Sequence, residues 1–471
     1  MAVTNLNRPL LHRKEWQMMT PAPTATAAGA FIVHDVASLD NLALLMSSAT
    51  VHYLYHHDED AWIQIPSGAL TGTFGAGSCG AAARWSRTVT ANGGSTTTAT
   101  TAGAITGIAI GRTIRFLTGT AANIGLERTI TGVIINPGGT STIQWSSALP
   151  AVVASTDTFA IDTGRFFVVN AGTFALGSIK EFDPLTLTWG SNLSITGLPA
   201  TWSTDGRLIS TPSHVAYASG TATAGGASTL TNGAKTWTTN QWTNYQVRIT
   251  GGTGSGQIRT IASNTGTALT TSTAWTTTPD ATSTYVIEGN DDFLYLMGNN
   301  AVTLYRYSIS GNTWTTLAPG VARAGAPVAG TVAAWVQDSD DANWANESDI
   351  KDGRYIFSFR GGGTALDRYD IALNTWLADT SYGPIAETFA SGSASAALGR
   401  YMFLRKDATN RFFKLSTRGN YVEALSTNLY PDGAAVIGDK LWVKLLDSTS
   451  GIAWLYSLAN TGTVVHRLML V

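Results

Sequence analysis

A pattern of two short apolar strands recurs along the chain, and most copies end on an aromatic residue followed by a tryptophan. We identify six copies, of which the clearest run from Phe293 to Trp314 and from Tyr355 to Trp376. Self-similarity on this scale is typical of repeat architectures, in which each unit buries its apolar face against its neighbours. The copies must therefore stack on one another or close into a ring.

The repeat predicts an all-β fold, namely a six-bladed β-propeller with four antiparallel strands in each blade. First strands rich in small residues, such as residues 78–83 and 392–397, suit the crowded centre of a ring, and larger Tyr and Trp residues follow on outer strands. Only 13% of the residues are charged. Low charge combined with β-branched residues and Gly-rich turns also favours an all-β fold.

Two of the predicted blades are interrupted between their first and second strands, by residues 87–162 and 217–289. The two segments resemble one another, because Ile114-Arg-Phe116 and Asp157-Thr-Phe159 in the first match Val247-Arg-Ile249 and Ser283-Thr-Tyr285 in the second. Each insertion is expected to form a small β-barrel or sandwich. Long connections of this kind are usually functional, so the face of the ring that bears both is the predicted contact face.

Residues 1–28 lack a regular periodicity and are predicted to form an extended N-terminal arm. Trp16 lies between breaks in this segment, so the arm either docks on a neighbouring subunit, packs on its own propeller or is disordered. We expect its removal to abolish assembly and to leave the fold intact. The predicted division of the chain is the arm (1–28), blade one and the start of blade two (29–86), the first insertion (87–162), blade two and the start of blade three (163–216), the second insertion (217–289), and blades three to six (290–471).

Charge, hydropathy and cysteine content argue against several classes of protein. The formal net charge of −2 lacks the basic balance that a nucleic-acid partner requires. No run of about 18 apolar residues is present, and the start of the chain lacks the apolar core of a signal peptide, so we expect no membrane span and synthesis in a cytoplasm. The lone Cys79 allows neither an internal disulfide nor a thiolate zinc site, and its small neighbours favour a buried thiol.

The spacing of Gly361-Gly-Gly363, Tyr369-Asp370 and Trp376 resembles the kelch repeat. Its best-preserved part is Asn374-Thr-Trp376, which recurs as Asn312-Thr-Trp314. The resemblance implies a kelch-like propeller, and kelch-type propellers are mostly interaction scaffolds with some enzymes among them. A tight turn followed by an indole packed between blades is sufficient to explain the Asn-Thr-Trp element.

The second insertion resembles a module found in bacteriophage structural proteins. The resemblance is carried by residues 236–242, 245–261 and 274–285. It implies a virion component of the tail, the neck or an attached fibre, made in the host bacterial cytoplasm. It supplies no catalytic residue that can be transferred to this chain.

Two enzyme families with similar rings require residues that this sequence does not match. A galactose-oxidase-like copper site needs a Tyr crosslinked to Cys together with His ligands, and no His cluster accompanies Cys79. A sialidase needs three arginines, a Tyr nucleophile and Ser-x-Asp-x-Gly-x-Thr-Trp turns, from which residues 308–314 depart. We therefore predict no enzymatic activity and no cofactor.

Two clusters contain residue types that bind metals. The first comprises His52, His56 and His57 with the acidic residues 58–60, but a strand and turn would splay these histidines, so we expect a solvated turn. The second is a weak candidate Ca²⁺ loop, for which a solvated loop is again favoured. Its acidic residues are Asp338, Asp340 and Asp341.

Four tryptophans are candidate binding residues, either for a protein interface or for a glycan: Trp16, Trp237, Trp242 and Trp275. The alternative for the last three is that they form the core of the second insertion.

We predict a non-enzymatic structural protein of the virion, a tail- or neck-associated scaffold that forms a symmetric homo-oligomeric ring and contacts other virion proteins. The alternatives are an adhesin for a host surface glycan and, remotely, a glycan hydrolase, for which the sequence suggests no suitably spaced carboxylate pair.

Overall fold

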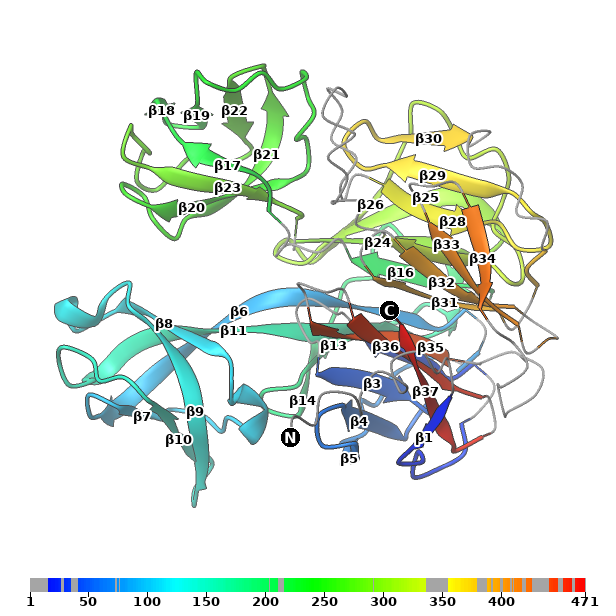
Figure 1. Cartoon of the computed structure of the whole chain (residues 1–471), viewed down its shortest axis with the longest axis horizontal. Coiled ribbons are helices and arrows are strands. Elements are labelled where there is room, and N and C mark those ends of the chain that lie inside the picture. Colours follow the sequence, from blue (N-terminus) through cyan, green and yellow to red (C-terminus); the bar gives the residue numbers. More distant parts are fainter. Residues whose placement is uncertain are drawn as a thin grey trace, which may run out of the picture.

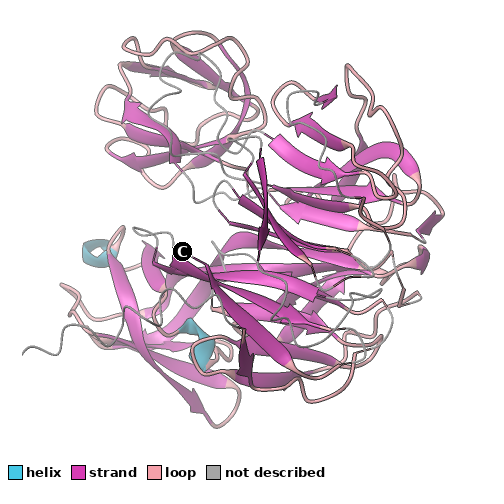
Figure 2. Ribbon diagram, turned by 45° about the vertical axis from the view of Figure 1, so that its right-hand side comes forward, coloured by secondary structure: helices cyan, strands magenta, loops and turns pink. Residues whose placement is uncertain are grey.

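The chain folds as an all-β protein with a β-propeller arrangement and additional β sheets (Figures 1 and 2). The computed structural model describes residues 16–26, 29–34, 41–72, 74–75, 77–202, 204–210, 216–290, 292–335, 355–378, 388–390, 393–398, 401–406, 409, 411–416, 421–425, 440–447, 452–459 and 462–470. Within these residues, no helix is both long enough and apolar enough to span a membrane. The predicted all-β propeller is confirmed at this level.

Five propeller blades are separate four-stranded antiparallel sheets. The first contains β2 (Phe31–His34), β3 (Leu42–Met46), β4 (His52–His56) and β5 (Ala61–Ile65). The second contains β16 (Arg207–Ser210), β24 (Phe293–Gly298), β25 (Ala301–Ser308) and β26 (Thr313–Thr316). The third contains β27 (Val332–Trp335), β28 (Tyr355–Phe359), β29 (Leu366–Asp370) and β30 (Thr375–Ala378). The fourth contains β31 (Ala394–Leu398), β32 (Tyr401–Arg405), β33 (Phe412–Ser416) and β34 (Tyr421–Leu425). The fifth contains β35 (Lys440–Asp447), β36 (Ile452–Leu458), β37 (Val465–Leu470) and the N-terminal strand β1 (Gln17–Met19).

A sixth sheet has eight strands and carries the first insertion. Its strands are β6 (Cys79–Gly94), β7 (Thr98–Thr101), β8 (Thr113–Thr118), β9 (Glu127–Asn136), β10 (Thr140–Trp145), β11 (Ser155–Val169), β13 (Ile179–Asp183) and β14 (Thr188–Asn192). One end of the sheet has the order β14-β13-β11-β6. The other end closes into a barrel, because β8 pairs back onto β11. Two short 3-10 helices, η1 (Gly107–Ala109) and η2 (Ala121–Asn123), lie in its connections, and β12 (Gly172–Thr173) pairs separately with β15 (Thr201–Trp202).

The second insertion is a seven-stranded sheet with the order β17-β23-β20-β21-β22-β19-β18. Its strands are β17 (Ala216–Thr221), β18 (Ala224–Gly226), β19 (Thr229–Thr231), β20 (Gln246–Gly251), β21 (Ile258–Asn264), β22 (Ala268–Thr271) and β23 (Thr284–Glu288). Strands β20 to β23 pair as β8 to β11 do in the first insertion. The likeness seen in the sequence therefore extends to strand pairing.

The first strands of the five blades and of the eight-stranded sheet contact one another in a closed cycle: β2, β6, β16, β27, β31, β35 and again β2. At Gly80 the strands approach closely enough to exclude even a methyl side chain. A Cβ added at Gly80 on β6 would lie 2.6 Å from the carbonyl oxygen of Phe167 and 2.4 Å from a methyl carbon of Val33 on β2. This crowding is consistent with the small residues that the sequence analysis noted on β6, β27 and β31, whereas β2, β16 and β35 carry larger side chains.

Indole groups link three of the sheets to the segment that precedes each of them. Three indole N–H groups donate to backbone carbonyl oxygens: Trp62 to Thr20 at 3.1 Å, Trp189 to Pro66 at 2.8 Å, and Trp314 to Ser194 at 2.8 Å. The preceding turn is equally specific, since Asn312 and Asn374 both adopt a positive φ, and their side-chain oxygens accept a hydrogen bond at 2.7 Å from Tyr307 and Tyr369, respectively. The interpretation of the Asn-Thr-Trp element as a turn followed by a packed indole is confirmed.

The described part of the N-terminal arm belongs to the propeller. Strand β1 pairs with β37, and Ala22 N–H donates to the Thr463 carbonyl at 2.6 Å. Thr20 N–H then reaches the Asp60 carboxylate at 3.0 Å, beside the first sheet. Of the alternatives for the arm, packing on its own propeller is the one that residues 16–26 follow. The expectation that its removal leaves the fold intact is not supported by these contacts.

Candidate interaction surface

The two insertions share an internal contact, in which an arginine side chain donates hydrogen bonds to backbone carbonyl oxygens of a loop. Arg128 on β9 donates to the carbonyl oxygens of Ser147 at 2.7 Å and Ala148 at 2.9 Å. Arg259, at the matching position of β21, donates to the Ala274 carbonyl at 2.9 Å. Each arginine ties its strand to the loop that leads to the last strand of the insertion. The two modules are therefore built alike, and their differences lie in what they expose.

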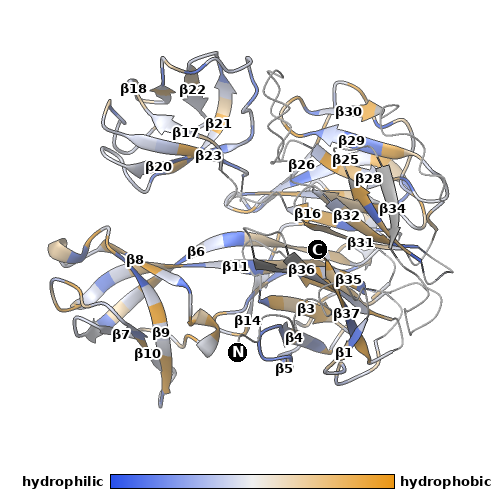
Figure 3. Ribbon diagram, in the orientation of Figure 1, coloured by the Kyte–Doolittle hydropathy of each residue, from blue (hydrophilic) through white to orange (hydrophobic). Residues whose placement is uncertain are grey.

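The first insertion exposes an apolar hairpin, whereas the matching hairpin of the second does not. Strands β9 and β10 project from the barrel (Figure 1), and Figure 3 shows hydrophobic residues along them. Ile134 and Ile135, near the hairpin tip, are 51% and 65% exposed. No Asp, Glu, Lys or Arg occurs in residues 129–156. A projecting, uncharged and apolar hairpin is the type of surface that commonly mediates protein–protein contact.

Two loops of the same module present further apolar side chains. Asn123 exchanges two hydrogen bonds with the backbone of Ala151, at 3.0 and 3.2 Å. These bonds bring together the loops that carry Ile124 and Val152, which are 48% and 57% exposed. The first insertion thus has apolar surface on adjacent loops as well as on its hairpin.

A cluster of charged residues joins the bases of the two insertions. Glu288, on β23, is 3% exposed and accepts two hydrogen bonds from Arg248 on β20. Arg84, on β6, lies 3.9 Å from Glu288 and 3.6 Å from Asp162 on β11. The hydrogen bonds with Glu288 raise the pKa of Arg248. This junction links the last strand of the second insertion to β6 and β11, the two strands that carry the first insertion.

We expect this junction to orient the two insertions relative to one another, and Glu288→Gln to loosen that orientation. The change removes the carboxylate that two arginines share, and charge-assisted hydrogen bonds of this kind contribute about 2 kcal/mol. Spin labels at Val152→Cys and Thr239→Cys should report a broader distance distribution in the variant. Cys79 is buried and should escape labelling. The matched control is Glu181→Gln, which affects a pair with Arg165 inside one sheet; an unchanged distribution for Glu288→Gln would show that the junction does not orient the modules.

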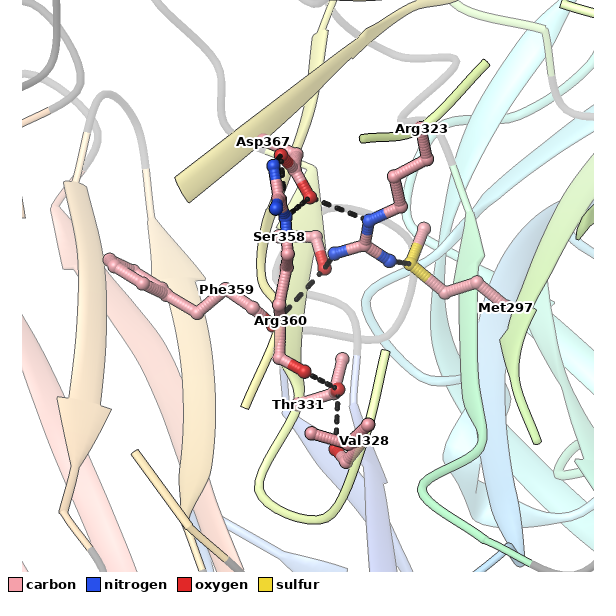
Figure 4. A network of polar contacts seen from close by, with 8 residues as sticks. All are labelled: Met297, Arg323, Val328, Thr331, Ser358, Phe359, Arg360 and Asp367. Atoms are coloured by element: carbon pink, nitrogen blue, oxygen red, sulfur yellow. Dashed lines mark hydrogen bonds and ion pairs between the residues drawn. The ribbon is translucent and has the colours of Figure 1, made fainter. Parts of the chain in front are cut away.

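Two arginines and an aspartate form a buried network between two blades (Figure 4). Arg323 Nε donates to Asp367 at 2.6 Å, its Nη2 donates to Ser358 at 2.8 Å, and its guanidinium lies 4.8 Å from the ring centroid of Trp376. Arg360 donates to both carboxylate oxygens of Asp367 at 2.6–3.0 Å. Arg323 and Asp367 are 4% and 1% exposed, so the network acts as an internal support.

The tryptophans proposed as a binding group in the second insertion come together in its interior. Trp242 is 0% and Trp275 is 6% exposed, and Trp237 is half-buried. Trp237 packs edge-on against Trp242, with ring centroids 6.3 Å apart. The alternative assignment to the insertion's own core is therefore the one that the structure follows. The signal was ambiguous in the sequence, because large amphipathic rings suit cores and interfaces alike.

Trp16 also lies against its own chain. Its ring centroid is 5.0 Å from that of Phe412 on β33, and it belongs to the apolar cluster shared by the last two sheets. Its environment is thus that of a packing residue.

The sequence analysis did not predict Ile134 and Ile135 as interaction residues. A signal was present, because the apolar run 133–135 before a Pro-Gly-Gly turn departs from the alternation of apolar and polar residues expected of a strand.

The prediction of a solvated histidine-rich turn is wrong for two of its three histidines. His52 is 0% and His57 is 5% exposed, because His57 lies against the last sheet and His52 against Trp189. Asp58 and Glu59 are exposed. The candidate Ca²⁺ loop with Asp338, Asp340 and Asp341 lies outside the described residues. Within the described residues, no group of three or more His, Cys, Asp or Glu side chains is arranged to hold a metal ion.

Cys79 is buried, as its small neighbours predicted. Burial raises the pKa of its thiol to about 12, so the thiol is protonated and unreactive near neutral pH. Its Sγ lies close to Gly206, where an added Cβ would approach it to 3.1 Å. The residue packs the centre of the ring.

No family model matches the chain, and no curated protein matches it. One similar solved structure is a structural genomics protein of unknown function from Bacteroides thetaiotaomicron. The similarity covers 81% of this chain and 71% of that protein, at 10% sequence identity and a TM-score of 0.25. A similarity this weak carries no argument about fold or function.

Proposed function

We propose that this chain is a non-enzymatic structural protein of a bacteriophage virion, which assembles with copies of itself around the tail or neck. The observation that carries the proposal is the projecting, uncharged hairpin of the first insertion, with Ile134 and Ile135 exposed. The resemblance of the second insertion to a phage module supports the virion setting. Other virion structural proteins would be its further partners.

The proposal includes a finer description of the ring. The five separate blades and the β14-β13-β11-β6 end of the eight-stranded sheet would make six kelch-like blades, since their first strands contact in one cycle. Such a ring is rigid, and its two insertions have related topologies. In this description the propeller is the platform and the insertions are the contact elements.

A second copy of the chain is the occupant that the hairpin suits best. Its surface is uncharged, so two copies can approach without burying an unpaired charge. Burying one isoleucine side chain stabilises an interface by about 1.5–3 kcal/mol. Beyond residue 130, moreover, β9 pairs only with β10 among the residues that the structure describes, so its other edge offers backbone groups to a partner strand.

The test is the molar mass of the purified protein by light scattering, together with that of Ile134→Thr/Ile135→Thr. We expect a discrete oligomer for the unaltered chain and at least about 100-fold weaker association for the variant. Threonine keeps the β-branched shape, so the fold should be retained. Val302→Thr is the matched control, because Val302 is an exposed apolar residue (44%) on a propeller strand.

A stable monomer would count against the assembly scaffold and favour the glycan-binding adhesin instead. In that case a glycan array would be the next measurement. The adhesin is the less supported alternative, because the tryptophans that suggested it lie mainly in the core of the second insertion.

A further inference from the structure

Two histidines of the first blade, the half-buried His34 and the buried His57, contact the last blade where the ring closes. His34 ends β2, and its Nε2 accepts a hydrogen bond at 3.1 Å from the backbone N–H of Val443 on β35. His57 follows β4, and its Nε2 accepts a hydrogen bond at 2.9 Å from the indole N–H of Trp442, also on β35. Adjacent residues of the last blade thus donate to two imidazoles of the first blade.

Both contacts require a neutral imidazole. An imidazole nitrogen that accepts a hydrogen bond carries no proton, and an imidazolium has donors on both nitrogens. Protonation of either histidine at Nε2 would therefore place one N–H against another. We propose that this seam is an acid-sensitive latch, in which protonation of His34 and His57 separates the last blade from the first.

The charged and titratable groups around His57 strengthen its preference for the neutral form. Lys444 on β35 places a cation nearby, and Asp58, which pairs with Lys444, offsets it only in part because Asp58 is 61% exposed. His34 adds a second repulsive group when protonated. Tyr55 and Tyr456 line the seam, and burial raises the pKa of both, so they stay neutral at acid pH. Beyond them lie Asp60, hydrogen-bonded to Tyr55, and Arg467.

The direction of the pH effect follows from these surroundings. Burial lowers the pKa of His34 to about 4, and burial with the Lys444 cation lowers that of His57 to about 3, from an ordinary value of 6.5. Because each pKa is lower in the closed seam than in an opened one, closure is fully stable above pH 6.5 and weakens as the pH falls below it. Between pH 7 and pH 5, opening should become about 20-fold more favourable for each histidine and roughly 500-fold for both.

The experiment is hydrogen exchange of the full chain at pH 7 and pH 5, corrected for the intrinsic pH dependence of exchange. Peptides covering β35 report the seam, because the Val443 amide itself donates to His34, and peptides covering β28 report a distant blade. We expect protection of β35 to fall by a factor of hundreds at pH 5 while β28 keeps its protection. Equal loss in both strands would overturn the latch, because it would indicate ordinary acid unfolding.

Variants separate the two histidines from other groups. His34→Gln/His57→Gln keeps uncharged acceptors, so protection of β35 should no longer depend on pH beyond the intrinsic correction. If the double variant does not fold, the single variants His34→Gln and His57→Gln are measured instead, with His57→Asn as a replacement for His57→Gln. Each single variant should halve the logarithm of the pH-dependent change in β35 protection. His52→Gln is the control, since His52 lies on the same blade against Trp189, away from β35. A double variant with the unaltered pH dependence would overturn the proposal.

Discussion

Asp367→Ala is expected to destabilise the fold by about 3–5 kcal/mol, because it removes the carboxylate that accepts hydrogen bonds from two arginines (Figure 4). Arg323 is almost fully buried and would keep its charge. Its remaining favourable contacts would be the hydrogen bond to Ser358 and the cation–π contact with Trp376. The loss exceeds that of a hydrogen bond, since a buried cation without its counter-charge is far more costly than a pair left intact.

Urea unfolding monitored by circular dichroism measures this effect. Glu181→Ala provides the control, because it also removes a carboxylate from an arginine pair on adjacent strands, but both partners are partly exposed and about 1 kcal/mol or less is expected. Asp367→Asn should fall between the two, as it keeps one acceptor oxygen and loses the charge. A loss below about 1 kcal/mol for Asp367→Ala would mean that the blades relax to hydrate Arg323.

The propeller was predictable from the sequence because its determinants are local. The Asn374-Thr-Trp376 element contains its own turn, since the left-handed Asn374 and the Tyr369 hydroxyl that binds it are five residues apart. The small residues on β6, β27 and β31 and the paired apolar strands are likewise visible within single segments of the sequence. The correspondence between the two insertions was predictable for the same reason, and Arg128 and Arg259 now explain part of it.

The parts that escaped prediction depend on residues distant in sequence. His57 and Trp442 are separated by 385 positions, so nothing near residue 57 signals that the imidazole is buried. The same holds for Trp16, which packs on Phe412, and for Glu288, which meets Arg84 on β6 just before the first insertion. In each case the local sequence specifies a polar or amphipathic side chain, and only ring closure or module docking decides its surroundings.

Deleting residues 1–19 should have an effect of similar size, about 5 kcal/mol, and should open the last blade. The deletion removes β1, the buried Met19 and the contact of Trp16 with Phe412. Apolar burial of a Met and a Trp accounts for most of that free energy. It also exposes β37 as an unpaired edge, which favours association of the damaged blades rather than a loss of assembly.

A chain that begins at Trp16 retains all these contacts and is the matched control for the deletion. Thermal unfolding and light scattering together decide between the two accounts of the arm. A lower melting temperature with larger, heterogeneous particles is expected if β1 completes the last blade. An unchanged melting temperature with dissociated subunits would instead show that the arm is an intersubunit contact. Its strand pairing would then stabilise the association of chains and not the fold of a single chain.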